Sequence, residues 1–239
     1  MEAKEYLKKY AYVYCYVISL CLLLAAGIRG VVAEVDSRQE FSNTPVLIID
    51  AGHGGMDGGA TSCTGVLEST VNLEIAQRLE QLIHLFGGKT VMTRTGPDSL
   101  ATEGDTIREQ KRSDLRNRLA MVRRYEQAIL VSIHQNQFPD PKYWGPQVFY
   151  APTEGSRELG EAVQAAMNEQ LAHGNRRQCK PSQGVYLMTH IESPGILVEC
   201  GFLSNPQEEA LLRSRDYQQK LCAVLAQALC RQLEQRTSA

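Results

Sequence analysis

The sequence has no strong excess of charge of either sign, and it lacks several motifs that would fix its chemistry at once. Its 239 residues carry 25 Lys and Arg against 27 Asp and Glu, a formal net charge of −2. Bulk basic charge therefore does not hold it to nucleic acid or to an anionic membrane. There is no His-Glu-x-x-His motif, which excludes the short-spaced zinc site of many metalloproteases. There is no Cys-x-x-Cys pair, which excludes the zinc sites built on that spacing.

The cysteines do not form the regular pattern of a disulfide framework. Of the seven, Cys15 and Cys21 fall in an apolar run near the N-terminus, which leaves an odd five in the rest of the chain. Cys222 and Cys230 are eight residues apart on an expected helix, hence about 12 Å apart and too distant to bridge. We therefore expect free thiols.

One long hydrophobic run occurs, at residues 10–28, where 19 uncharged and mostly apolar residues follow three lysines. As a helix this run would extend about 28 Å, close to the thickness of the hydrocarbon core of a bilayer. The charge asymmetry predicts a cytoplasmic N-terminus and an exported remainder. We interpret residues 1–33 as a signal or membrane anchor and residues 34–44 as a linker. An uncleaved anchor inserted in the membrane is favoured over a cleaved signal peptide, and a buried core helix is a third alternative.

From residue 45 onward, short apolar runs alternate with segments of helical periodicity. The expected strands are 46–50, 89–94, 128–133, 147–151, 185–188 and 195–199, and helices are expected between most of them and at the C-terminus. This alternation predicts a single α/β domain over residues 45–236, with a twisted, mostly parallel sheet of about six strands and helices on both faces.

Side chains that can bind a metal follow three of these strands. His53 follows the first strand, His134 the third, and Glu199 lies at the end of the sixth. Open α/β sheets place their sites at these strand ends. Glu68 begins the helix after a glycine-rich loop, which can fold back toward His53. Two imidazoles and a carboxylate are the ligands of a catalytic zinc, and a further carboxylate serves as base. We predict one Zn²⁺ per chain, bound by His53, Glu68 and His134, with Glu199 as the catalytic residue.

Other interpretations of the same segments are open. Taken singly, each of these His and Glu residues could have a structural role. The loop at 50–55 suggests phosphate binding, but it lacks the Gly-Lys-Ser/Thr ending of a nucleotide site. Cys200 could be a nucleophile, although adjacent strand residues face opposite sides, so burial is expected.

These motifs, in this order, resemble those of the zinc-dependent N-acetylmuramoyl-L-alanine amidases of the family-three type. The resemblance is carried by residues 46–59 with Glu68, by 132–136 and by 198–206, and it covers nearly all of 45–235. It implies hydrolysis of the amide between the lactyl group of N-acetylmuramic acid and L-alanine, with the glycan strand and stem peptide of peptidoglycan bound at the site. Residues 136–150 resemble the spore-cortex, germination-specific members of Firmicutes, which prepare muramic-δ-lactam.

Substrate contacts are expected from a second group of residues: Arg94, Asn136, Trp144 and His190. Trp144 with Tyr143 could form a wall on which a sugar stacks. Residues 105–124 carry seven basic against three acidic side chains, which is typical of a solvated helix face but could also meet stem-peptide carboxylates or a protein. An accessory protein is therefore a further candidate partner.

Two other functions are open at this point. One is a different zinc peptidase of the cell wall, such as a carboxypeptidase or an endopeptidase. The other is a catalytically inactive module that binds peptidoglycan. The reaction products separate the alternatives, because an amidase releases the whole stem peptide and leaves unsubstituted muramic acid. In each case the predicted location is outside the cytoplasmic membrane.

Overall fold

The computed structural model describes residues 45–237. The predicted anchor at 1–33 and linker at 34–44 lie outside the described residues, so both stay predictions. Within residues 45–237, no helix combines the length and the apolar character needed to span a bilayer. The described elements are, in chain order, β1 (Val46–Ala51), α2 (Glu68–Leu85), β2 (Lys89–Met92), α3 (Ile107–Val122), β3 (Ala128–Asn136), β4 (Gln147–Tyr150), α4 (Ser156–Gln170), β5 (Lys180–Pro181), α5 (Tyr186–His190), β6 (Gly195–Phe202), α6 (Pro206–Leu212) and α7 (Arg215–Thr237).

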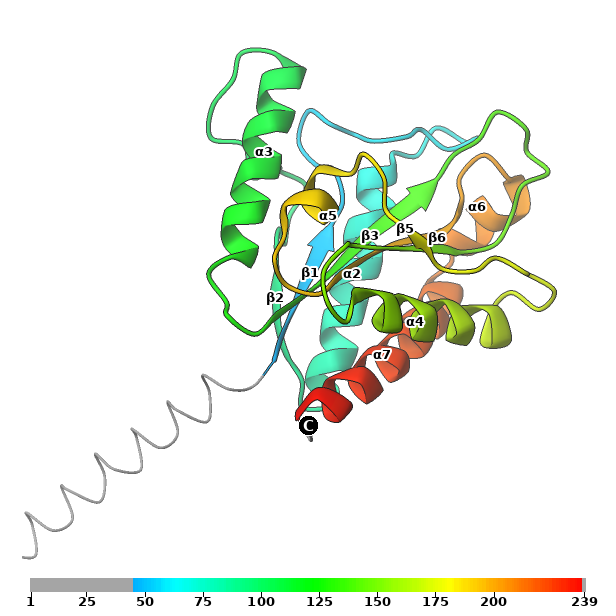
Figure 1. Cartoon of the computed structure of the whole chain (residues 1–239). Coiled ribbons are helices and arrows are strands. Elements are labelled where there is room, and N and C mark those ends of the chain that lie inside the picture. The colour runs from blue at the N-terminus through cyan, green and yellow to red at the C-terminus, as the bar shows by residue number, and fades with distance from the viewer. Residues whose placement is uncertain (1–44, 238–239) are drawn as a thin grey trace, which may run out of the picture. The chain divides into compact units, whose positions relative to one another are not determined.

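The strands form one six-stranded, mostly parallel sheet in the order β2-β1-β3-β6-β4-β5. Figure 1 shows how the helices lie around this sheet. β2, β1, β3 and β6 run parallel to one another. β4 is antiparallel to β6 and parallel to β5. The carboxyl ends of β1, β3 and β6 therefore meet at one edge of the sheet. This arrangement confirms the predicted α/β fold. It also brings together the three strand ends that carry the candidate metal-binding and catalytic side chains.

Helices cover both faces of the sheet, which explains why its central strands are continuous apolar runs. On one face, α2, α4 and α7 bury side chains such as Ile75, Val163 and Leu225 against β1, β3 and β6. On the other face, α3 and α5 bury Leu119 and Met188. The expected layers are thus confirmed, with the larger core on the α2–α4–α7 side.

The predicted strand at 185–188 is wrong. Residues 186–190 form the short helix α5, and the strand in this part of the chain is β5, which pairs Lys180 with Phe149. Leu187, Met188 and Ile191 are buried at helical spacing on the core side of α5, so packing against α3 and the sheet decides the conformation. A short apolar run by itself does not distinguish strand from helix.

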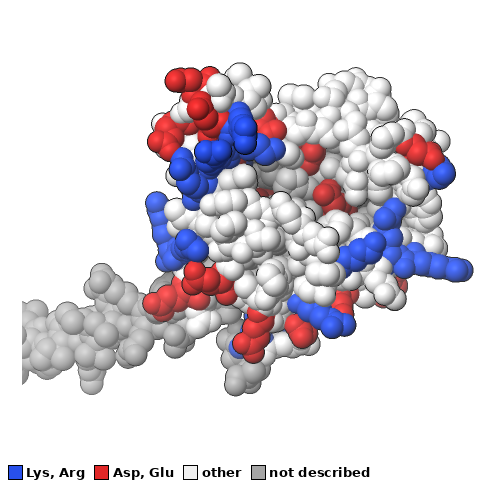
Figure 2. Space-filling view, turned by 45° about the horizontal axis from the view of Figure 1, so that its top comes forward, with Lys and Arg blue, Asp and Glu red and all other residues white. Residues whose placement is uncertain are grey.

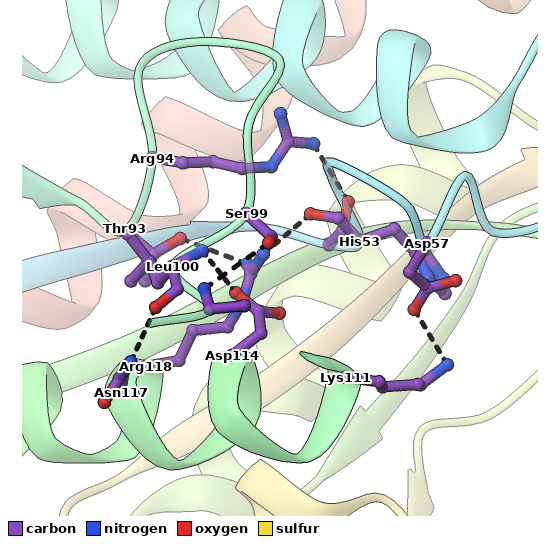
Figure 3. A network of polar contacts seen from close by, with 12 residues as sticks. His53, Asp57, Thr93, Arg94, Ser99, Leu100, Lys111, Asp114, Asn117 and Arg118 are labelled. Atoms are coloured by element: carbon purple, nitrogen blue, oxygen red, sulfur yellow. Dashed lines mark hydrogen bonds and ion pairs between the residues drawn. The ribbon is translucent and has the colours of Figure 1, made fainter. Parts of the chain in front are cut away.

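A buried ion-pair network lies where β1 and β3 approach α3. Arg118 is 1 % exposed; its Nη1 donates to Asp50 Oδ1 at 2.6 Å, and its Nε donates to Asp114 Oδ2 at 2.8 Å. Ser132 Oγ donates to the other oxygen of Asp50 at 2.5 Å. Burial opposes ionisation of Asp50, but Arg118 and Ser132 lower the pKa of this carboxyl to about 2. The network joins α3 to the sheet next to the strand ends (Figure 3).

We expect Arg118→Met to lower the free energy of unfolding by about 3 kcal/mol or more, because it leaves two carboxylates without their buried cation. Arg116→Met on the same helix is the control; Arg116 forms an exposed ion pair with Glu103, so its loss should cost less than about 1 kcal/mol. Urea unfolding measures both. Equal losses in the two variants would contradict the role of the network.

Candidate metal and active site

The three residues predicted to bind a metal lie together at the carboxyl edge of the sheet. Glu68 is between the two imidazoles: its Oε2 is 3.3 Å from His53 Nε2, and its Oε1 is 3.0 Å from His134 Nδ1. The candidate ligand atoms of the three side chains all lie within 4.8 Å of one another. Two nitrogen donors and a carboxylate at this separation fit a zinc ion with one position left for water.

The backbone around these residues leaves room for nothing larger than glycine at two positions. A Cβ on Gly52 would lie 2.3 Å from the ring of His134, and a Cβ on Gly59 would lie 2.6 Å from Glu68 Oε2. His53 itself has a φ of 61°, a left-handed conformation that is strained for a residue with a Cβ. Arg118 Nη2 donates to the His53 carbonyl at 2.6 Å and holds this turn. Local backbone geometry therefore aims both imidazoles at Glu68.

Asp57 fixes the orientation of the His53 ring, a role that the sequence analysis missed. His53 Nδ1 is 3.0 Å from Asp57 Oδ2, and Lys111 Nζ lies 2.9 Å from the same oxygen (Figure 3). A carboxylate on the far nitrogen of a metal-binding histidine sets its tautomer and leaves the other nitrogen for the metal. The four-residue spacing in the loop was a signal for this pair, because such a turn can bring the two side chains together.

Glu68 is held at the start of α2 by neighbours from three segments. Ala60 N donates to its Oε2 at 2.9 Å, whereas Gln135 N and Asn72 Nδ2 donate to its Oε1 at 3.1 and 3.2 Å. The register of β3 and β6 shifts between His134 and Asn136, and such a bulge re-aims side chains. At this irregularity the backbone N–H of Gln135 points toward Glu68 Oε1. Gln135 and Asn72 are supporting residues that the strand-end pattern did not reveal.

The titration behaviour of the site matches a place for a cation. Burial by itself would lower the pKa of His53, but hydrogen bonds to Asp57 and Glu68 raise it to about 9. Burial opposes ionisation of Glu68, yet hydrogen bonds from His134 and His53 hold its pKa well below the ordinary value. Without metal, the raised pKa favours the protonated, positively charged form of His53 beside Glu68. A metal ion would replace that charge at the same point.

Glu199 stands beside this group without being part of it. It is opposite His134 in the β3–β6 pairing, and its Oε2 is buried with no hydrogen-bond partner among the described residues. Burial, together with the charge of Glu68, raises the pKa of Glu199 to about 7 although the two histidines oppose the shift. A carboxyl group that titrates near neutral pH can both accept and return a proton.

Comparison with known proteins identifies the family. The family described as N-acetylmuramoyl-L-alanine amidase matches residues 47–231. The chain belongs to this amidase family. It is 35 % identical over 188 residues to the germination-specific N-acetylmuramoyl-L-alanine amidase of Bacillus subtilis, an alignment that covers 78 % of each chain.

Solved structures of amidases share the fold. The CwlD amidase from Clostridioides difficile, determined in complex with the GerS lipoprotein, superposes with a TM-score of 0.77 and 34 % identity, covering 80 % of this chain and 99 % of that one. The amidase AmiC2 of Nostoc punctiforme superposes with a TM-score of 0.68 and 27 % identity, covering 81 % and 99 %. The chain is therefore a cell-wall hydrolase that acts on peptidoglycan as an N-acetylmuramoyl-L-alanine amidase.

Arg94, predicted to contact substrate, does not have the exposure that this role requires in the amidase. Its side chain is 4 % exposed and donates to the carbonyl groups of Ala51, Gly52, Ser69 and Gly96 at 2.8–3.0 Å. These bonds use four of the five N–H groups of the guanidinium. Arg94 therefore stabilises the turn that carries His53, and its burial does not favour the predicted contact with substrate.

The other predicted substrate residues lie outside the metal group. Trp144 is 44 % exposed on the loop at 137–146, which Glu208 ties to β6 by accepting from Gly145 N and Phe202 N. Asn136 ends β3, and its carbonyl accepts from Leu203 N. His190 ends α5, stacks on Tyr186 with ring centroids 4.2 Å apart, and bonds to the helix backbone. Contacts of these three residues with substrate stay predictions.

Four of the seven basic side chains at 105–124 form ion pairs with carboxylates. Besides Arg118, which is buried, the pairs Lys111–Asp57, Arg116–Glu103 and Arg123–Glu192 join cations of this stretch to carboxylates. At the upper left of Figure 2, basic side chains form a patch that acidic side chains border. Lys111 and Arg118 of this stretch hold Asp57 and the His53 turn in place. The remainder of the stretch is mostly a solvated helix face.

Gly52→Ala should weaken zinc binding at least about tenfold, the effect expected when a metal ligand is displaced from its orientation, because the added methyl overlaps the His134 ring. Gly96→Ala is the control, since a Cβ there meets nothing within 4 Å. Competition of the purified variants with a fluorescent chelator measures the zinc affinity. Equal affinity in both variants would show that His134 is not held against Gly52 for metal binding.

Proposed function

We propose that this amidase works with one zinc ion bound by His53, Glu68 and His134, and that Glu199 is its general base. The observation that carries the proposal is the Glu68 carboxylate bridging two imidazoles, with the unpartnered carboxyl of Glu199 opposite His134. The bond cut is the amide between the lactyl group of N-acetylmuramic acid and L-alanine.

The side chains divide the work of hydrolysis. When bound, zinc supplies Lewis acidity, which makes water more acidic and polarises a carbonyl oxygen. Glu199 accepts the proton of the attacking water and then passes it to the leaving nitrogen of L-alanine. In the metal-free protein, burial raises the pKa of Glu199 to about 7, and this burial favours return of the proton. Asp57 keeps the His53 ring in place throughout. This sequence of steps needs no covalent intermediate.

The biological setting is part of the same proposal. The similarity to a germination-specific amidase over 78 % of the chain supports spore-cortex peptidoglycan as substrate and a step toward muramic-δ-lactam as outcome. The apolar run at 10–28 supports export and membrane anchoring. Since the CwlD amidase was determined with a lipoprotein, we extend the proposal to an accessory protein that binds this chain.

The two competing functions have less support. A carboxypeptidase or endopeptidase of the wall is less well supported, because the family that matches residues 47–231 is one of amidases. A catalytically inactive binding module would have no reason to retain a buried Glu199 beside a complete set of ligands.

Glu199→Gln should keep zinc at the wild-type stoichiometry and lower kcat by about 100-fold or more, the contribution of a positioned proton-transfer group. The amide side chain has the same shape but cannot accept the proton. Glu192→Gln is the control, because Glu192 is exposed and pairs with Arg123 outside the site. Release of stem peptide from muropeptides, followed by liquid chromatography, gives the rate. Wild-type turnover by zinc-loaded Glu199→Gln would remove Glu199 from the mechanism.

A further inference from the structure

A cavity of about 400 Å³ opens beside Glu199, and its lining residues come from β4, from β6 and from the segment at 180–185, which includes the edge strand β5. Phe149 and Leu197, which are opposite each other in the β4–β6 pairing, form its floor together with Val185. Lys180 and Ser182 contribute polar groups, and Glu199 lies at one end. The cavity is thus continuous with the group that we assign as the base, and its size is that of a small-molecule or short-peptide site.

Two polar groups of this cavity lack partners within the protein. The hydroxyl of Ser182 is buried without a hydrogen bond to any described residue, although the Ser182 backbone N–H donates to Tyr150 O at 2.8 Å and fixes the segment. Lys180 is exposed, and no carboxylate of the described residues forms an ion pair with it. Buried polar groups are almost always hydrogen-bonded. The buried Ser182 hydroxyl therefore indicates a ligand with a complementary polar group, and the exposed Lys180 ammonium beside it is free to pair with an anionic one.

The substrate offers two different surfaces to a site at the scissile amide. On the glycan side are N-acetylated sugars, which carry hydroxyl and amide groups and no charge. On the peptide side is the methyl group of L-alanine, followed by residues that carry free carboxylates. An apolar floor with a cation above it matches the peptide side. The exposed aromatic residues that suit a sugar face, such as Trp144, are on the separate loop at 137–146.

We propose that this cavity binds the first two residues of the stem peptide. The methyl of L-alanine lies on Phe149 and Leu197, the Lys180 ammonium pairs with the carboxylate of the second residue, and the Ser182 hydroxyl bonds to the peptide backbone. The inference rests on the proposed role of Glu199, since that residue places the scissile bond at the end of the cavity. Lys180 thereby has the role that the sequence suggested for Arg94, and it determines specificity without taking part in bond cleavage.

Two matched disaccharide dipeptides test the proposal. Both end in D-glutamate whose side-chain carboxyl is capped as a methylamide; one has a free α-carboxylate, and the other has a carboxamide in its place. For the zinc-loaded enzyme, Lys180→Ala should raise KM for the acid by about three- to tenfold, as expected for one partly exposed charge-assisted contact. The kcat should change by less than about twofold, because the contact is the same in ground and transition states. KM for the carboxamide should stay unchanged.

Two further variants separate specificity from a structural effect. Lys180→Arg should restore KM for the acid, whereas Lys220→Ala, an exposed lysine on α7 away from the cavity, should have no effect on either substrate. An equal change in KM for acid and carboxamide, or no change in Lys180→Ala, would overturn the proposal.

A binding measurement keeps this test independent of the proposed mechanism. Titration of Glu199→Gln with the acid, with and without Lys180→Ala, should show the same three- to tenfold loss of affinity. If zinc-loaded wild-type enzyme cleaves neither substrate, the proposed function fails by itself. The titration then still tests whether the cavity binds the stem peptide. Weaker binding of the acid by the Lys180→Ala double variant supports that role, and equal binding overturns it.

Discussion

The site depends on one interaction, the contact of the Glu68 carboxylate with His53 on one side and His134 on the other. The three residues come from the loop after β1, the start of α2 and the end of β3, and nothing in the chain order brings them together. Burial has removed the water that would otherwise solvate the Glu68 carboxylate, so this carboxylate depends on its contacts with the two imidazoles for stabilisation. Every neighbouring feature serves that convergence: glycines 52 and 59 allow the close approach, and the bulge in β3 turns the Gln135 amide toward Glu68.

A second layer of buried charge keeps this arrangement in place. Arg118 joins Asp50 and Asp114 to the backbone of the loop that carries His53, while Arg94 fixes the same loop from another direction. Asp57 and Lys111 link the His53 ring to α3. Lys111, Asp114 and Arg118 of α3 thus give internal support, whereas Arg108 and Arg112 of the same helix are exposed. Lys180 lines the cavity beside Glu199 and supplies a positive charge there.

The sequence predicts those parts of the fold and site that depend on local patterns. His53 follows β1, and His134 and Glu199 lie near the carboxyl ends of β3 and β6, so the topology of a parallel sheet brings these residues to one edge. Local patterns did not predict two kinds of feature: the conformation of a short apolar run and the burial of two arginines. Residues 185–188 were assigned to a strand because a short apolar run fits either element, and only packing on α3 decides for α5. Arg94 was expected to contact substrate and Arg118 to lie on a solvated helix face or to meet a partner, since burial at acceptors that are tens of residues away leaves no periodic signal in the sequence.

The central claim is that a metal held around Glu68 enables this chain to cut one specific bond of peptidoglycan. Mass spectrometry of purified cortex and vegetative peptidoglycan, digested by the enzyme before and after zinc removal, tests it most directly. The account predicts intact stem peptides with a free N-terminal L-alanine and muramic acid without peptide, formed from cortex in the presence of zinc and lost on its removal. Cleavage within the peptide or the glycan, or the same products after zinc removal, would contradict the account.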